Sequence, residues 1–230
     1  MTQKHLSARE INEMIDYTCW AVFNRTSGMP EDNTALIEET LAKHPDLKIR
    51  GWYDVSGSQP NAQLMIWAHG PSFDGVQDAL RDIKIALNGG PGNHEVDMTW
   101  SAFGMHRPAE FNKGNVPAFL AGKPEGEWVC VYPFVRSYDW YVIDPSERRK
   151  MLLEHGNIGR ANPQILSSTL AAFGFGDYEW VVSLEADHPW QIVDLMRQMR
   201  DSEARLHVRN EYPFHFGHRV KVSEIVNVLI

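Results

Sequence analysis

Tyr132, Arg136 and His155 are the residues whose types and spacing suggest chemistry. Tyr132 and Arg136 lie four residues apart in WVCVYPFVR (128–136), a segment with the composition of a β-strand. The two-residue period of a strand places Tyr132, Phe134 and Arg136 on one face, together with the earlier residues Trp128 and Cys130. A guanidinium pairs with carboxylates and aromatic rings contact apolar rings, so this face suits a ligand with an apolar ring system and carboxylate arms.

His155 is predicted to close the helix that follows this strand, over residues 145–155, with Gly156 at its C-terminal cap. Met151 and Leu152 precede it by four and three residues and share its helix face. A histidine on an apolar face is more often a hydrogen-bonded core residue than a metal ligand. No second histidine or carboxylate at helical spacing completes a zinc pair. A single imidazole is, however, the usual proximal ligand of a heme.

Each of the other two residues also has a structural interpretation. A tyrosine in a strand usually packs its ring and hydrogen-bonds its hydroxyl at the surface. Arg136 could be a solvated charge at the strand end that pairs with Asp139 or Asp144, which would contribute little stability.

The elements that would position these residues form an internal repeat. Each half of the chain has the pattern strand, helix, strand, turn, strand, helix, which indicates the β-α-β-β-α-β order of a ferredoxin-like domain. The first half is predicted to have strands at 17–25, 47–55 and 62–69, with helices at 31–44 and 71–87. The second half is predicted to have strands at 127–136, 165–173 and 178–186, with helices at 145–155 and 188–203.

We therefore expect an α+β fold of two tandem ferredoxin-like domains, at residues 10–90 and 127–222. Their edge strands would pair into one continuous sheet or close into a dimeric α+β barrel, with the helices outside. Residues 91–126, rich in Gly, Pro and Asn, are predicted to be a connector that serves as a binding loop or as a covering linker. The apolar C-terminal tail (219–230) is expected at a subunit contact.

Composition excludes several classes of protein. The net charge of −8 and the lack of a Lys/Arg cluster argue against a nucleic-acid partner. No run of about 18 apolar residues predicts a membrane span, and the polar first residues do not resemble a signal peptide. Cys19 and Cys130 lie in apolar segments and are predicted to be buried free thiols. We expect a cytoplasmic protein.

Four stretches together resemble the coproheme decarboxylases of the chlorite dismutase superfamily, in particular their actinobacterial branch. These are YPFVRSYDWYVIDPSERRKMLLEHG (132–156), GFGDYEWVVSLEAD (174–187), MRQMRDSEARLHVRNEYPFHFGHRV (196–220) and HRPAEFNKGNVPAFLAG (106–122). The resemblance covers nearly the whole chain. It implies two ferredoxin-like domains per subunit, a homopentamer, and transient contact with coproporphyrin ferrochelatase.

The resemblance also implies residue roles. His155 would be the proximal ligand of the iron, and Tyr132 the catalytic tyrosine of the Y-P-x-x-[K/R] strand. Arg136 would bind near a propionate, with Phe134 and Trp140 also contacting the porphyrin. Iron coproporphyrin III (coproheme) would be substrate and redox centre, and hydrogen peroxide the oxidant. A radical on Tyr132 would take hydrogen from a propionate, and two rounds would convert two propionates to vinyls and give heme b.

Asn115 departs from this family pattern. The actinobacterial branch has a distal histidine before V/I-P-A-F, but this chain reads KGNVPAF. An asparagine amide cannot take a proton near neutral pH, so Asn115 would be a weak substitute for the base that activates peroxide. Other branches use a glutamine whose place corresponds to Ala204 here. We therefore expect slow peroxide activation, unless His106 or water replaces the base.

Three alternatives remain open at the level of sequence. A chlorite dismutase or peroxidase would need a distal arginine that faces the iron, and no arginine occupies the matching position at Ala204. The substitution at Asn115 is compatible with a heme- or coproheme-binding protein that has only weak peroxidase activity. The third is a ferredoxin-like scaffold without cofactor, in which His155 only caps its helix.

Overall fold

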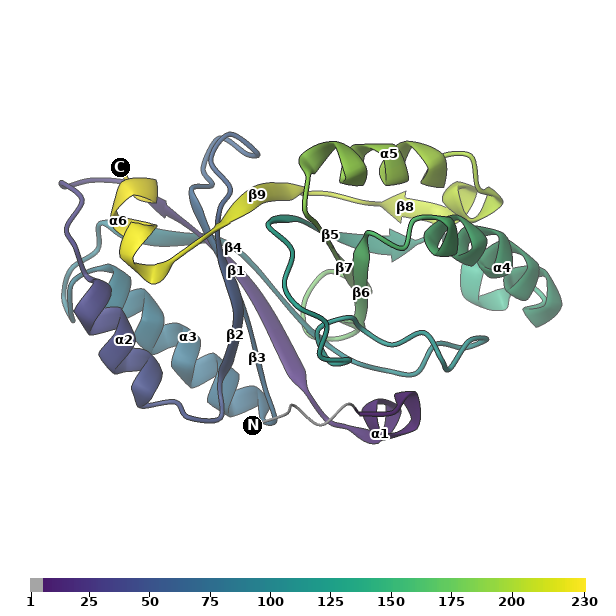
Figure 1. Ribbon diagram of the computed structural model, residues 1–230, viewed down its shortest axis with the longest axis horizontal. Helices are drawn as coiled ribbons and strands as arrows, with labels where there is room; N and C mark the ends of the chain where they lie inside the picture. Colours follow the sequence, from purple (N-terminus) through teal and green to yellow (C-terminus); the bar gives the residue numbers. More distant parts are fainter. Residues whose placement is uncertain (1–5) are drawn as a thin grey trace. The chain divides into compact units, whose positions relative to one another are not determined.

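The computed structural model describes residues 6–230, which form two compact units. Unit 1 contains the described residues up to Met14 together with His106–Phe214, and unit 2 contains Ile15–Met105 together with His215–Ile230. Both units combine helices with antiparallel strands (Figure 1). None of the helices in the described part of the chain is long and apolar enough to cross a membrane.

Unit 2 is an antiparallel sheet with the strand order β4-β1-β3-β2-β9, and helices α2 and α3 lie next to each other beside it (Figure 1). Its elements are β1 (Tyr17–Arg25), α2 (Thr34–Ala42), β2 (Lys48–Asp54), β3 (Leu64–Gly70), α3 (Phe73–Leu87), β4 (Val96–Met105) and β9 (His215–Val220). The strands and helices predicted for the first half of the chain are confirmed, within a few residues at each end.

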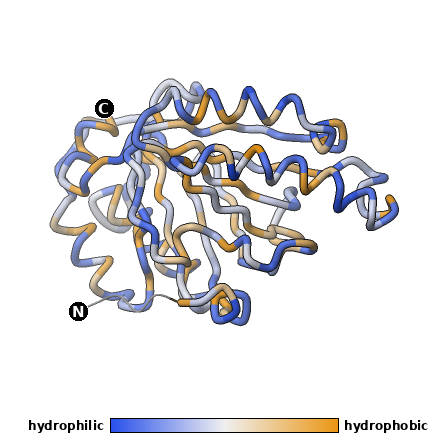
Figure 2. Tube along the Cα trace, turned by 45° about the vertical axis from the view of Figure 1, so that its right-hand side comes forward, coloured by the Kyte–Doolittle hydropathy of each residue, from blue (hydrophilic) through white to orange (hydrophobic). Residues whose placement is uncertain are grey.

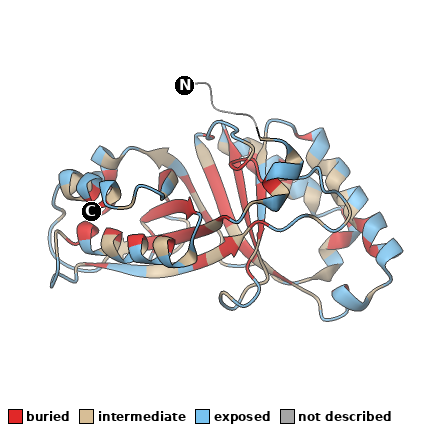
Figure 3. Cartoon of the chain, turned by 90° about the horizontal axis from the view of Figure 1, so that it is seen from below, coloured by how far each residue is buried: buried red, intermediate tan, exposed pale blue. Residues whose placement is uncertain are grey.

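The core of unit 2 lies between this sheet and its two helices. Every second residue of β1, at Cys19, Ala21 and Phe23, faces the core, as the strand period requires. Along α3 the buried residues recur at helical spacing and include Val76 and Ile83. Hydrophobic and hydrophilic residues therefore alternate along the helices (Figure 2), and the buried residues gather on the strands and on one side of each helix (Figure 3).

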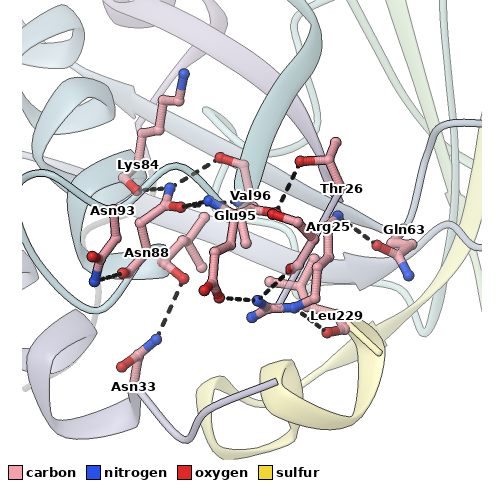
Figure 4. Close-up of polar contacts among 12 residues, drawn as sticks. Arg25, Thr26, Asn33, Gln63, Lys84, Asn88, Asn93, Glu95, Val96 and Leu229 are labelled. Carbon is pink, nitrogen blue, oxygen red and sulfur yellow. Dashed lines mark hydrogen bonds and ion pairs between the residues drawn. The ribbon is translucent and has the colours of Figure 1, made fainter. Parts of the chain in front are cut away.

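Strand β4 lies in the range 91–126, which was predicted to be a connector that serves as a binding loop or covering linker. It pairs with β1 along its length, from Val96 opposite Arg25 to Met105 opposite Tyr17. The turn before it is held by Asn88, whose side chain donates to the carbonyl of Val96 at 2.9 Å and accepts from its N–H at 2.8 Å (Figure 4).

The C-terminal tail, which was expected at a subunit contact, packs on its own chain. It forms β9, a short 3-10 helix (Val222–Glu224) and α6 (Ile225–Val228), and it contributes Ile225, Val228 and Leu229 to the core of unit 2. The Arg25 guanidinium donates to the Leu229 carbonyl at 2.8 Å and pairs with Glu95 at 2.8 Å (Figure 4). Apolar burial and this buried cation therefore hold the tail in place.

Unit 1 has the strand order β6-β7-β5-β8, all antiparallel. This order corresponds to β2-β3-β1-β4 in unit 2, so the repeat seen in the sequence extends to the connectivity of the strands. The elements of unit 1 are α1 (Ala8–Glu13), β5 (Trp128–Arg136), η1 (Trp140–Val142), α4 (Pro145–Ala161), β6 (Leu166–Ala171), β7 (Trp180–Ala186), α5 (Pro189–Met199), η2 (Glu203–His207) and β8 (Val208–Asn210).

Helix α4 does not end at His155–Gly156, so that prediction is wrong. The helix continues to Ala161, and its C-cap is Asn162. The side-chain amide of Asn162 donates to the Ile158 carbonyl and to Gln198 Oε1, both at 2.9 Å. These hydrogen bonds stabilise the C-terminal end of the helix. The prediction that Cys19 and Cys130 are buried free thiols is confirmed.

Candidate functional site

The predicted face of β5 is present in unit 1. Tyr132, Phe134 and Arg136 are half-buried, whereas the residues between them are buried. Strand β7 pairs with this segment, with Val182 opposite Tyr132 and Trp180 opposite Phe134. The alternation shows that the three candidate side chains share the less covered face of the strand.

Arg136 is held between two aromatic rings. Its guanidinium carbon lies 5.0 Å from the ring centre of Phe134 and 4.2 Å from that of Trp140, close enough for cation–π attraction. Its Nη1 donates to the carbonyl of Ala204 at 3.3 Å. The side chain is therefore oriented by its neighbours. Asp139, proposed above as a surface partner, instead accepts a hydrogen bond from the Ser137 hydroxyl.

His155 lies within α4, on the same side as Met151 and Leu152. Its Nδ1 is buried and has no hydrogen-bond partner among the described residues. Burial lowers the pKa of the imidazole below its usual value, and the positive charge of Arg136 lowers it further, while Glu154 acts in the opposite direction. The ring is therefore neutral at pH 7, which is the form that ligates a metal. The interpretation of His155 as a hydrogen-bonded core residue finds no support here.

Tyr132 stacks on Phe214, with ring centres 4.5 Å apart and an angle of 17° between the planes. Burial raises the pKa of its phenol, and the charges of Cys130 and Glu211 raise it further, against the opposing effect of two nearby arginines. The phenol is therefore protonated across the physiological range. A neutral phenol held in one orientation can act as a donor of a hydrogen atom.

Trp140, Met151 and Ala204 form a small buried cluster that joins η1, α4 and η2. Trp140 contacts the Arg136 guanidinium, so this cluster connects the arginine to the helix that carries His155. Ala204 was considered as the position of a distal glutamine. The structure shows it 3% exposed and packed in this cluster, with no side-chain group that could act on peroxide.

Asn115 is exposed on the loop between β4 and β5. Its backbone N–H donates to the Asn112 carbonyl at 3.0 Å, and Asn12 of α1 donates to the nearby Lys113 carbonyl at 2.8 Å. His106 contacts the same Asn12, at 2.8 Å. These contacts connect Asn115 and His106 to the loop and to α1.

Sequence analysis missed four polar or aromatic neighbours of this site, which are Phe214, Glu179, Tyr141 and His207. Glu179 accepts a hydrogen bond from the backbone N–H of Arg136 at 2.8 Å, and the ring of His207 lies 5.4 Å from that of Trp140. These contacts join segments 43 and 67 residues apart, and the pairing register that creates them has no local signal.

Comparison with known proteins identifies relatives of this chain. The model of the chlorite dismutase family matches residues 28–220. The chain is 41% identical over 222 residues to the coproheme decarboxylase of Mycolicibacterium smegmatis, covering 94% of this chain and 95% of that protein. It is 25% identical over 210 residues to the coproheme decarboxylase of Staphylococcus saprophyticus, covering 83% and 84%.

Solved structures show the same fold. The chlorite dismutase from Candidatus Nitrospira defluvii in complex with imidazole superposes with a TM-score of 0.77 at 15% identity, covering 92% of this chain and 94% of that one. The family match over most of the chain, the long alignment to one relative and the shared mixed α+β fold all lead to one assignment. This chain belongs to the chlorite dismutase family.

Proposed function

We propose that this protein is a coproheme decarboxylase, which uses hydrogen peroxide to convert two propionates of iron coproporphyrin III to vinyl groups and so forms heme b. The observation that carries the proposal is the 41% identity to a coproheme decarboxylase over 94% of the chain. The arrangement of side chains in unit 1 supports roles for Tyr132, Arg136 and His155.

Substrate binding would rest on one imidazole and one guanidinium. His155 is neutral and half-buried, and its Nδ1 has no hydrogen-bond partner among the described residues, so its imidazole would bind the iron of the substrate. Arg136 would pair with a propionate, and Phe134 and Trp140 already fix its orientation. An arginine that is ordered before binding loses less conformational entropy when it pairs with a carboxylate.

Tyr132 would carry the chemistry between the redox centre and the propionate. When bound, the substrate iron supplies the redox chemistry with peroxide. Each round removes two electrons from a propionate and releases carbon dioxide, and hydrogen peroxide accepts two electrons as it becomes two waters. The neutral phenol of Tyr132, held against Phe214, would give up a hydrogen atom and then take one from the propionate carbon.

Asn115 would make peroxide activation slow. The first step needs a group that takes a proton from peroxide, and an amide cannot do so near pH 7. Its exposed position on the loop leaves it accessible to solvent, so water would take this proton in its place. We therefore propose an active enzyme with a low rate of peroxide consumption.

The finer architecture follows the family resemblance. We propose that the two units are ferredoxin-like domains of a dimeric α+β barrel, because both have the same strand connectivity. We further propose a homopentamer in the cytoplasm, which binds coproheme and hydrogen peroxide and has transient contact with coproporphyrin ferrochelatase.

A heme-binding protein with weak peroxidase or chlorite dismutase-like activity is the less favoured alternative, and Asn115 is its only specific support. Stepwise addition of peroxide to the coproheme complex of the wild type and of Tyr132→Phe separates the two functions. The decarboxylase proposal expects porphyrin masses with one and then two carboxyl groups removed in the wild type only. Equal porphyrin bleaching in both proteins, with no decarboxylated product, would establish the alternative.

A further inference from the structure

A second tyrosine lies in a hydrogen-bonded chain beside the proposed site. The hydroxyl of Tyr141, in η1, donates to Glu179 Oε2 at 2.8 Å and accepts a hydrogen bond from Trp180 Nε1 at 3.0 Å. The phenol therefore lies between an indole and a carboxylate. Neither the reaction nor the binding roles described above use any of these three side chains.

This chain reaches the face of β5 that carries Tyr132. The rings of Trp180 and Phe134 are nearly parallel, at 14°, with centres 6.2 Å apart, because the two residues are direct partners in the β5–β7 pair. Tyr132 lies two residues before Phe134 on the same face. Diagonal neighbours in such a pair are about 7–8 Å apart. An electron can cross this distance between oxidisable rings in a single step.

Glu179 provides the proton acceptor that oxidation of the Tyr141 phenol requires. A phenol becomes a strong acid when it is oxidised. A neutral phenol therefore loses an electron readily only where a base accepts its proton at the same time. Burial raises the pKa of Tyr141 above its usual value, so the phenolate is not populated and the proton must leave together with the electron. The carboxylate at 2.8 Å is placed to accept it.

Tyr138 provides a contrast in the same segment. Its hydroxyl accepts a hydrogen bond from the Arg209 guanidinium at 2.6 Å, and that guanidinium lies 4.2 Å from its ring centre. A cation beside the phenol opposes the loss of an electron and offers no proton acceptor. The two tyrosines are both accessible, but only Tyr141 has an oxidisable neighbour and a base.

We propose that Trp180, Tyr141 and Glu179 form an escape path that removes an oxidising equivalent from Tyr132 when no propionate is in position to react. This inference rests on the proposed function, which supplies the radical on Tyr132 from peroxide. Tyr141 loses one electron through Trp180 to the Tyr132 radical, and its phenolic proton passes to the Glu179 carboxylate. The Tyr132 radical accepts that electron and takes one proton from water, which restores its O–H group. The hydroxide left behind is neutralised when Glu179 releases its proton to solvent.

The path ends where a reductant can reach it. Tyr141 is 44% exposed, so a solution thiol or ascorbate can reduce its radical by one electron. After both propionates have reacted, further peroxide would still oxidise Tyr132, and without this path no substrate would remain to reduce the Tyr132 radical. The path would thus protect the site during excess peroxide.

The test uses the coproheme-loaded protein, excess peroxide and a nitroso spin trap, with adducts located by peptide mass spectrometry. Wild type, Tyr141→Phe, Trp180→Phe and the control Tyr138→Phe are compared. We expect trap adducts on Tyr141 in the wild type and in Tyr138→Phe. In the Tyr141 and Trp180 variants we expect adducts on Tyr132 instead, together with severalfold fewer turnovers before inactivation.

The absence of adducts on both Tyr141 and Trp180 in the wild type, or equal inactivation in all four proteins, would overturn the inference. Product masses are read from the same samples. Absence of decarboxylated porphyrin throughout would contradict the proposed function, whereas the position of the adducts decides the escape path independently.

Discussion

Replacement of His215 by phenylalanine should remove a loss of stability that the wild type suffers at mildly acidic pH. His215 begins β9, is 2% exposed, and has no hydrogen-bond partner at either ring nitrogen among the described residues. Its ring lies 4.7 Å from that of Trp100. Burial lowers the pKa of the imidazole to about 4, compared with 6.5 for an exposed histidine.

The sign of the effect follows from proton binding. Between these two pKa values the unfolded chain binds a proton at His215 and the folded chain does not, so stability falls as the pH falls through this window. Each pKa unit corresponds to about 1.4 kcal/mol. The loss attributable to His215 is therefore about 2 kcal/mol between pH 8 and pH 5, and approaches about 3 kcal/mol at lower pH.

Urea unfolding at several pH values between 8 and 5 measures this effect, with His215→Phe and His215→Leu compared with the wild type. At pH 8 the histidine is neutral in both states, so the difference there reports packing against Trp100 and should differ between the two variants. The additional difference that develops towards pH 5 should be the same for both variants, at about 2 kcal/mol. A difference between wild type and variants that stays constant with pH would refute the argument.

Three further changes test other parts of the structure. Arg136→Met should weaken binding of iron coproporphyrin III by about 10- to 100-fold, because a charged hydrogen bond contributes about 1.5–3 kcal/mol; unchanged affinity in an absorbance titration would exclude its propionate role. Asn115→His should raise the rate of peroxide consumption by up to about 10²–10⁴-fold, with a rise through pH 6–7 that the wild type lacks; an unchanged pH profile would show that this position does not act on peroxide. Met151→Ala should cost about 2–5 kcal/mol in urea unfolding, whereas Leu153→Ala, at a side chain 57% exposed, should cost far less; equal costs would contradict the packing of this cluster.

The fold could be predicted where local periodicity was strong. Strand β1 has the predicted limits, 17–25, because an apolar run is bounded by polar residues at both ends. Strand β4 was missed, because its faces are covered unevenly and its apolar residues do not alternate regularly. The packing of the C-terminal tail on its own chain was not predicted, because it involves residues far away in the sequence, such as Arg25, about 200 positions before it.

The part of the site that could be predicted from the sequence is the set of residues on one face of strand β5. The period of β5 was sufficient to group Tyr132, Phe134 and Arg136. The end of α4 was misjudged because His155–Gly156 resembles a helix terminus, but the glycine does not adopt a positive φ and the helix continues. Phe214 and Glu179 reach the site through tertiary contacts that a single sequence does not encode locally.

The central claim is tested most directly by the ratio of carboxyl groups lost to peroxide consumed. The wild-type protein, loaded with iron coproporphyrin III, is titrated with hydrogen peroxide while porphyrin masses are recorded. We expect one carboxyl group to be lost for each peroxide consumed, in two successive steps that end at heme b, even if the steps are slow. Peroxide consumption with bleaching of the porphyrin, and with all four of its carboxyl groups retained, would contradict it.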